Sequence, residues 1–183
     1  MIADVLLPLL TVGLAEMGDK TQLSILFLAS RTKNHLKLLL GVMIGFLIVD
    51  GVAVLIGSSV AHLLPIIVVK IFSGVVFVVF GLLTLRREDK LSESRLHSKN
   101  PFLSGFTLIF LAEWGDKTQI AAALFATEYN PMMVLLGTMI SLGAQSAIAV
   151  CVGRIILQRI DKKLMARVSG LAFILVGLSF FLL

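Results

Sequence analysis

The sequence predicts an all-α integral membrane protein built from six transmembrane helices in two inverted three-helix repeats. Its composition is 58% hydrophobic with a mean hydropathy of +1.02, well above the apolar share of soluble domains. The apolar residues fall into six blocks, each close to the ~20 residues that cross a bilayer core. A nine-residue motif also occurs twice, once in each half of the chain.

The apolar blocks define the expected helices and leave little chain between them. They cover residues 5–30, 38–61, 66–85, 102–127, 132–154 and 164–183. No basic segment precedes the first block, so we expect a retained helix and not a cleaved signal peptide. We expect a first repeat over 1–85, a cytoplasmic linker over 86–101 and a second repeat over 102–183. Because this linker is too short for a soluble catalytic domain, the chemistry must lie inside the bundle or at its rim.

Basic residues are distributed unevenly between the connecting loops. When the loops alternate between two sides of a membrane, one side collects Arg31, Lys33, Lys37, Arg86, Arg87, Lys90, Arg95, Lys99, Arg154, Arg159, Lys162, Lys163 and Arg167. The positive-inside rule places these loops in the cytoplasm and both termini outside. Topology therefore explains the net charge of +5, and no nucleic-acid partner is expected.

The two halves remain similar beyond the motif. At an offset of 96 residues, Gly41, Met43, Ile44, Gly57, Ser73, Gly74, Phe77, Gly81 and Leu82 match Gly137, Met139, Ile140, Gly153, Ser169, Gly170, Phe173, Gly177 and Leu178. Because each repeat has an odd number of helices, the second copy enters the membrane from the opposite face. Such inverted repeats are typical of transporters that alternate between outward-open and inward-open states. The glycine pairs Gly74/Gly81 and Gly170/Gly177 predict close helix packing.

The motif places ionisable side chains halfway along the first and fourth blocks. Residues 14–22 read LAEMGDKTQ, and residues 111–119 read LAEWGDKTQ. An ionisable group at the centre of a membrane helix costs about 2.5–3.5 kcal/mol on insertion scales. Its presence in both repeats therefore indicates a function.

The four motif carboxylates predict a cation site between the repeats. Glu16 and Asp19 are three residues apart, as are Glu113 and Asp116, so each pair is expected to share one face of a helix. With both motif lysines protonated, the cluster has a charge of −2, which one divalent cation would neutralise. Without a cation, clustered like charges in a low dielectric favour proton uptake, so the site predicts a metal/proton exchanger.

The donor atoms near the motifs indicate a hard cation. The three histidines lie in loops or at span ends, and the single cysteine lies far from either motif along the chain. Oxygen donors fit Ca²⁺, Mn²⁺ or Mg²⁺ better than Zn²⁺ or Cu⁺. The residues that could complete or orient the coordination shell are Lys20, Thr21, Gln22, Lys117, Thr118 and Gln119.

Three features leave more than one interpretation open. The Glu and Lys of each motif, four residues apart, could simply neutralise each other, although this leaves the aspartates unexplained. Gly18 and Gly115 could break their helices and expose carbonyl groups to a ligand, or could allow close helix packing. Asp50, midway along the second block, could relay protons, act as a peripheral ligand, or stay protonated and hydrogen-bonded.

The motifs and their arrangement resemble the family of small calcium/manganese–proton antiporters. In that family a Glu-x-Gly-Asp-Lys/Arg-Thr/Ser motif is duplicated on two inverted three-helix repeats. Both copies are intact here, as EMGDKT and EWGDKT, and the resemblance covers the whole chain. The family includes a Golgi protein linked to glycosylation disease and bacterial manganese exporters. The resemblance implies that Glu16, Asp19, Glu113 and Asp116 bind the ion, and that a chain this short exports Mn²⁺ across a bacterial inner membrane.

We therefore expect a secondary active transporter, and not an enzyme, that exports a divalent cation, Mn²⁺ or also Ca²⁺, in exchange for protons. Its expected partners are these ions and the bilayer, no cofactor is expected, and a homo-oligomer is compatible with the sequence.

Two other functions compete with this one. An intramembrane aspartyl protease would use Asp19 and Asp116 as its dyad, but its Gly-x-Gly-Asp pattern needs glycine where this chain has Glu16 and Glu113. An exporter of amino acids or other small organic solutes would need groups for both a carboxylate and an amine. The surplus of acids fits a small cation better.

Overall fold

Eight α-helices and no β-strand make up the part of the chain that the structure describes. This computed structural model describes residues 2–17, 19–63, 65–86, 100–151 and 162–182, so most of the expected linker lies outside it. The helices are α1 (Ile2–Glu16), α2 (Lys20–Ser30), α3 (His35–Leu63), α4 (Ile66–Arg86), α5 (Pro101–Ala112), α6 (Lys117–Glu128), α7 (Pro131–Cys151) and α9 (Lys162–Leu182).

Four of the six apolar blocks form single helices, namely α3, α4, α7 and α9, within a few residues of the expected bounds. The first and fourth blocks are not continuous helices as their apolar runs predict: each is divided into two helices, α1 and α2 or α5 and α6. Among the described helices, three are long and apolar enough to cross a bilayer, namely 35–61 of α3, 67–85 of α4 and all of α7.

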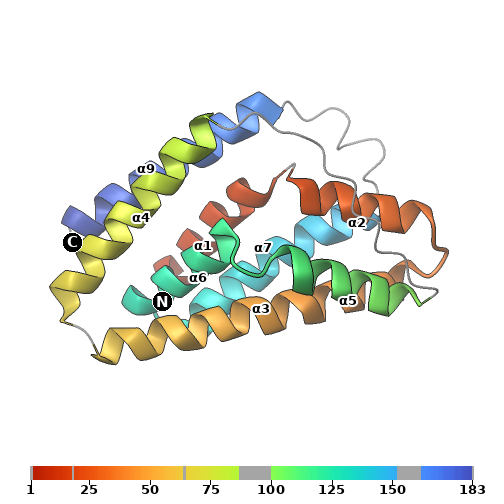
Figure 1. The fold of residues 1–183 in the computed structure, drawn as a ribbon, viewed down its shortest axis with the longest axis horizontal. Coiled ribbons are helices and arrows are strands. Elements are labelled where there is room, and N and C mark those ends of the chain that lie inside the picture. The colour runs from red at the N-terminus through yellow and green to blue at the C-terminus, as the bar shows by residue number, and fades with distance from the viewer. Residues whose placement is uncertain (1, 18, 64, 87–99, 152–161, 183) are drawn as a thin grey trace.

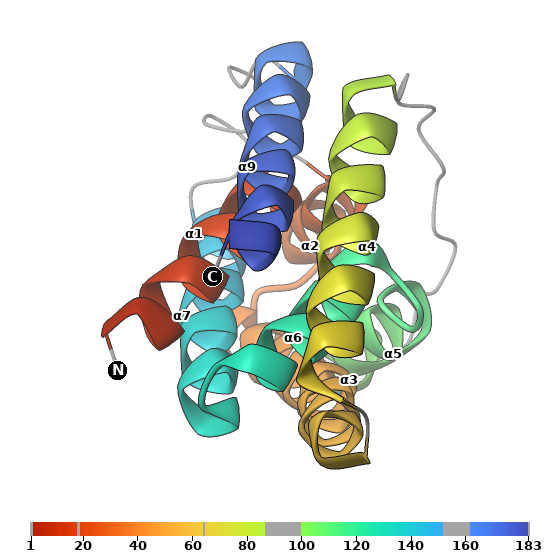
Figure 2. The same ribbon diagram turned by 90° about the vertical axis from the view of Figure 1, so that its left-hand side faces the viewer.

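The helices form two groups, as Figures 1 and 2 show. α4 and α9 lie side by side, run in opposite directions and stand on one side of the molecule. In the other group, α3 packs on α5 and α6, and α7 packs on α1 and α2. Phe77 of α4, Phe125 of α6 and Phe173 of α9 are fully buried, and their rings connect the two groups. The broken helices lie within the larger group, where α1 and α2 pack on α7 and α5 and α6 pack on α3.

Glycines at matching positions allow the closest helix contacts in both halves. A Cβ on Gly41 would overlap the carbonyl of Phe102, where α3 meets α5. A Cβ on Gly137, 96 residues later, would overlap the carbonyl of Val5, where α7 meets α1. The glycine pairs of α4 and α9 also face each other, because a Cβ at any of the four would come within 3.0 Å of a glycine carbonyl on the opposite helix. The close packing expected for these two pairs is confirmed.

Replacing Gly41 with Ala is expected to lower the unfolding temperature of the purified protein in detergent. The added methyl group would overlap a backbone oxygen, which cannot rotate away, and such overpacking costs about 1–3 kcal/mol. Gly51 lies on the same helix and has no neighbour within 4 Å of its missing Cβ, so Gly51→Ala is the matched control. Equal unfolding temperatures for the two variants would contradict the α3–α5 contact.

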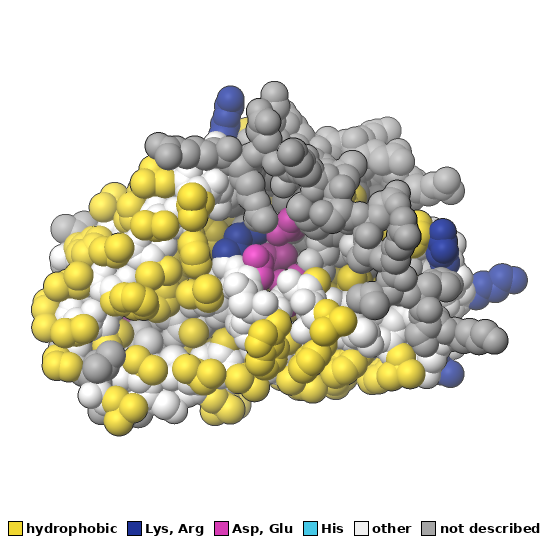
Figure 3. Space-filling view, viewed as in Figure 1, with side chains coloured by type: hydrophobic (Ala, Val, Ile, Leu, Met, Phe, Trp, Pro, Cys, Tyr) yellow, Lys and Arg dark blue, Asp and Glu magenta, His cyan; other side chains and the backbone are white. Residues whose placement is uncertain are grey.

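Large apolar side chains cover much of the molecular surface. Leu55, Phe72 and Leu175, for example, are each more than half exposed. Figure 3 shows hydrophobic side chains over the left and lower parts of one face, with acidic and basic side chains gathered near its centre. Apolar surface on this scale is typical of helices that face lipid.

Candidate cation site

Both motifs interrupt their helices instead of lying within them. The Asp in each motif follows the end of the preceding helix, so the expectation that each Glu and Asp share one helix face is wrong. Gly115 explains the second break, because its φ of +81° lies in the left-handed region that glycine adopts without strain. Nothing lies within 4 Å of its missing Cβ, so it breaks the helix and does not serve close packing. Gly18 lies outside the described residues.

The two breaks contain the same backbone turn. The Asp19 N–H donates to the Glu16 carbonyl at 3.0 Å, and the Asp116 N–H donates to the Glu113 carbonyl at 3.1 Å. Asp116 is the N-cap residue of α6, yet its side chain makes no capping hydrogen bond. Its carboxylate therefore does not cap the N-terminus of α6.

Three of the four motif carboxylates converge. Glu16, Asp19 and Asp116 each place a carboxylate oxygen within 4.8 Å of the other two. Two oxygens that bind one Ca²⁺ ion at 2.3–2.6 Å lie at most about 5 Å apart, so this spacing suits a single divalent ion. Glu16 is buried, whereas the two aspartates are partly exposed. The chain thus brings acids from both motifs into one cluster, and the two aspartates of this cluster are partly exposed at the molecular surface.

Lys117 of the second motif pairs with the acids of the first. Its Nζ lies 2.7 Å from Asp19 Oδ2 and 3.8 Å from Glu16 Oε1. Among the described residues, the ion pairs of Lys117 are therefore made across the two motifs, and not with the Glu four residues before it. The side chain of Lys20 lies outside the described residues. With three carboxylates and one ammonium ionised, the described cluster has a charge of −2.

Glu113, the fourth motif acid, is not among the three carboxylates that lie within 4.8 Å of one another, and it has a different partner. Its side chain is 3% exposed, and its Oε1 accepts a hydrogen bond of 2.5 Å from Thr21 Oγ1. This bond also crosses between the motifs, because Thr21 belongs to α2 and Glu113 follows α5. The two motifs are therefore joined by two contacts. Lys117 of the second motif pairs with the acids of the first, and Thr21 of the first motif donates to Glu113 of the second.

Gln119 holds the second break. Its Oε1 accepts a hydrogen bond of 2.6 Å from the Gly115 N–H, and its Nε2 donates to the Val49 carbonyl at 3.1 Å. It thereby connects the turn before α6 to α3. Thr118, the residue before it, is buried on α6.

Gln145 of α7 joins the site, and sequence reasoning did not include it. Its Oε1 accepts a hydrogen bond from Gln22 Nε2, and its Nε2 donates to the Gly13 carbonyl at 3.1 Å. The signal in the sequence is an amide within an apolar block, at the position that matches Val49 in the other half.

Asp50 lies on α3, close enough to the second motif to interact electrostatically with Glu113 and Asp116. It is 3% exposed, and its Oδ2 has no hydrogen-bond partner among the described residues. A buried carboxylate oxygen without a partner is costly, so this side chain is poorly explained by structure alone.

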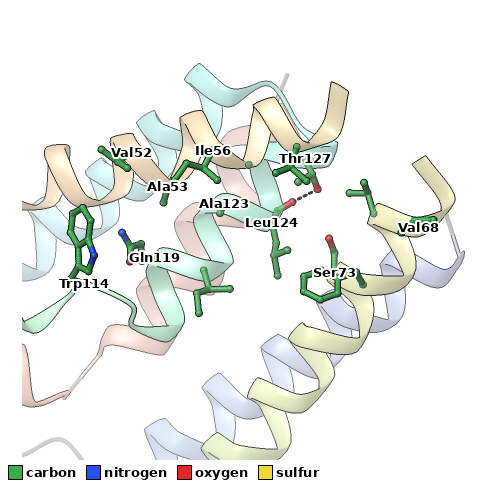
Figure 4. Close-up of a pocket in the computed structure, with 15 residues that line it drawn as sticks. Val52, Ala53, Ile56, Val68, Ser73, Trp114, Gln119, Ala123, Leu124 and Thr127 are labelled. Atoms are coloured by element: carbon green, nitrogen blue, oxygen red, sulfur yellow. Dashed lines mark hydrogen bonds between the residues drawn. The ribbon is translucent and has the colours of Figure 1, made fainter. Parts of the chain in front are cut away.

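A cavity of about 530 Å³ adjoins the second break (Figure 4). It lies between α3, α4 and α6, with Trp114 and Gln119 at one end and Val68 and Thr127 at the other. Its walls are almost entirely apolar. No carboxylate, histidine or cysteine of the described residues lines the cavity, so the candidate ion site is the acid cluster.

Comparison with known proteins places the chain among cation transporters. The family model described as "Divalent cation/proton antiporter GDT1" matches residues 4–92 and 101–182. A Vibrio cholerae protein named "Putative manganese exporter" is 30% identical over 171 residues, covering 92% of this chain and 86% of that protein. The "GDT1-like protein sll0615" of Synechocystis is 30% identical over 189 residues, covering 91% of each chain. No solved structure matches.

Proposed function

Because the chain belongs to the GDT1 family of divalent cation/proton antiporters, we propose that it exports Mn²⁺, and also accepts Ca²⁺, in exchange for protons. The observation that carries this proposal is the cluster of Glu16, Asp19 and Asp116, which combines acids from both motifs at the spacing of one ion. The name of the Vibrio cholerae relative supports Mn²⁺ as the substrate. Oxygen donors accept both ions.

In this proposal the three clustered carboxylates coordinate the ion directly. Glu113, which Thr21 holds within electrostatic reach of Glu16 and Asp116, is the fourth acid of the site. Gln22 and Gln119 orient the two breaks through their hydrogen bonds, and do not bind the ion directly. The transported ion is the substrate, and it would lie among the acids with the Lys117 ammonium beside it.

The charge of the cluster explains how metal and protons alternate. A divalent cation neutralises the −2 charge of three carboxylates and one ammonium, and two protons would do the same. With either occupant, the site has no net charge while the protein changes between its outward-open and inward-open states. The empty, ionised site would have a high free energy in the low-dielectric interior during that change. Exchange of one ion for two protons would be electroneutral.

We place this site in two inverted three-helix repeats. α1 with α2, and α5 with α6, would form the first helix of each repeat, broken at the midplane as in other secondary transporters. The matching glycine contacts and the matching turns at the two breaks support this symmetry. The basic loops would face the cytoplasm of a bacterial cell, with both termini outside.

Asp50 is proposed to carry protons toward the site. Its replacement by Asn is expected to leave Mn²⁺ binding within about threefold of wild type, because Asp50 is not one of the three clustered carboxylates, while slowing Mn²⁺-driven proton movement by about tenfold or more. Binding is measured in detergent and proton movement in liposomes. Equal loss of both would make Asp50 part of the ion site instead.

The function is tested by reconstituting the wild-type protein in liposomes that enclose a pH-sensitive dye. Addition of Mn²⁺ or Ca²⁺ outside should drive protons out of the vesicles, and an imposed proton gradient should drive metal uptake or release. Protein-free liposomes are the control. No metal-dependent proton movement under either gradient would exclude exchange, and proton-coupled movement of amino acids instead would favour the organic-solute exporter.

A further inference from the structure

We propose that Gln145 is a positioning residue that braces the first helix break and thereby sets the ion affinity and selectivity of the site. This inference rests on the proposed function. It concerns a residue outside both motifs, on a helix that contributes no carboxylate to the cluster.

One amide of α7 holds both ends of the segment that carries two of the clustered acids. Gly13 precedes Glu16 by three residues, and Gln22 follows Asp19 by three residues. Gln145 donates to the Gly13 carbonyl at 3.1 Å and accepts from the Gln22 side chain. Because both hydrogen bonds come from a single side chain, the distance between the end of α1 and the start of α2 is tied to α7.

The surroundings of this amide are closely packed. A Cβ on Gly13 would lie 2.5 Å from Ser141 Oγ and 3.7 Å from Gln145 Nε2, so a larger residue there would displace the Ser141 side chain. Ser141 Oγ also lies 3.4 Å from Gln145 Nε2. Gln22 and Ser141 are buried, so loss of the brace would remove one hydrogen-bond partner from each of these polar side chains.

In the described part of the chain, no side chain of α3 braces the second break as Gln145 braces the first. The position of α3 that matches Gln145 is Val49, and only its backbone carbonyl takes part, by accepting from Gln119. Gln119 closes that break from within, through the Gly115 N–H. Loss of Gln145 would therefore loosen only the first break, and would let Glu16 and Asp19 move relative to the acid from the second motif.

If the three clustered carboxylates are held less firmly, the site should lose affinity for the smaller ion more than for the larger one. It should therefore select less well between ions of different size. Mn²⁺ needs shorter ligand distances than Ca²⁺, so it loses more when the ligands are no longer held together. Loss of groups that orient metal ligands costs 10–100-fold in affinity in characterised metal sites.

The test is Gln145→Leu in the full-length protein, assayed for Mn²⁺- and Ca²⁺-driven proton movement in liposomes. The KM for Mn²⁺ is expected to rise about tenfold, the KM for Ca²⁺ to rise less, and the maximal rate to stay within about threefold of wild type. Gln145→Met, which keeps an unbranched chain of similar length, is the second variant if the Leu variant does not fold. Thr138→Val is the matched control, because Thr138 is a buried polar residue two turns earlier on the same helix and its Oγ1 has no described hydrogen-bond partner.

The outcomes separate this inference from the function it rests on. A lower maximal rate with unchanged KM values would show that Gln145 contributes to folding alone. Wild-type behaviour of both Gln145 variants would show that it contributes neither to folding nor to the positions of the ion ligands. Either result would overturn the inference while leaving exchange intact. Absence of exchange in the wild-type protein would instead remove the proposed function, and the inference with it.

Discussion

Replacement of Asp116 with Asn is expected to reduce metal-dependent proton movement by about a hundredfold or more while leaving the protein folded. The change removes one negative charge and one of the three converging carboxylates. A divalent ion bound to the remaining groups would then carry an uncompensated positive charge in a low-dielectric site. Binding of Mn²⁺ in detergent should therefore be lost together with transport.

Among the clustered acids, Asp116 is the one whose substitution is expected to disturb the fold least. It is the N-cap residue of α6 and its side chain makes no capping hydrogen bond, so Asn can take the same backbone position without loss of a contact. Replacement of Asp19, by contrast, would also remove its ion pair with Lys117. An effect of Asp116→Asn on transport can thus be separated from an effect on stability.

The matched control makes the reverse exchange at another N-cap. Asn100 caps α5 and accepts a hydrogen bond from the Phe102 N–H, which an Asp would accept as well. Asn100→Asp should transport normally, and both variants should unfold near the wild-type temperature. Normal transport by Asp116→Asn would show that Asp116 is not a ligand.

Replacement of Lys117 with Gln is expected to tighten Mn²⁺ binding by about tenfold and to slow the maximal transport rate by a similar factor or more. The ammonium lies among the acids, 2.7 Å from Asp19 and 3.8 Å from Glu16, so it competes with the ion for their charge. Without it, the bound ion faces less repulsion and leaves more slowly. The three clustered acids are also left with a charge of −3, which two protons no longer neutralise, so the proton-loaded return step is slowed.

Two further variants test this second prediction. Lys117→Arg keeps the charge and should retain transport. Lys70→Gln removes a lysine whose ion pair with Glu128, at 3.4 Å, lies away from the acid cluster, so it should leave Mn²⁺ binding unchanged. Weaker Mn²⁺ binding by Lys117→Gln would show that the lysine supports the ion site instead of competing for it.

The pattern of apolar residues was enough to predict four of the helices. α3, α4, α7 and α9 agree with the expected blocks because about twenty consecutive apolar residues determine a helix in lipid regardless of its neighbours. The same pattern predicted one helix where α1 and α2 lie, and one where α5 and α6 lie. Hydropathy does not register the left-handed backbone at Gly115 that ends the helix.

The sequence by itself determined the chemistry of the site, because the acids, the lysines and the lack of nearby His or Cys are properties of the two motifs. Only the tertiary structure decided which of these groups meet. Lys117 pairs across the motifs, Thr21 bonds to Glu113, and Gln145 joins the site from α7. These contacts connect residues about 90 or more positions apart, and local spacing cannot specify them because they depend on how the two broken helices pack against each other and against α3 and α7.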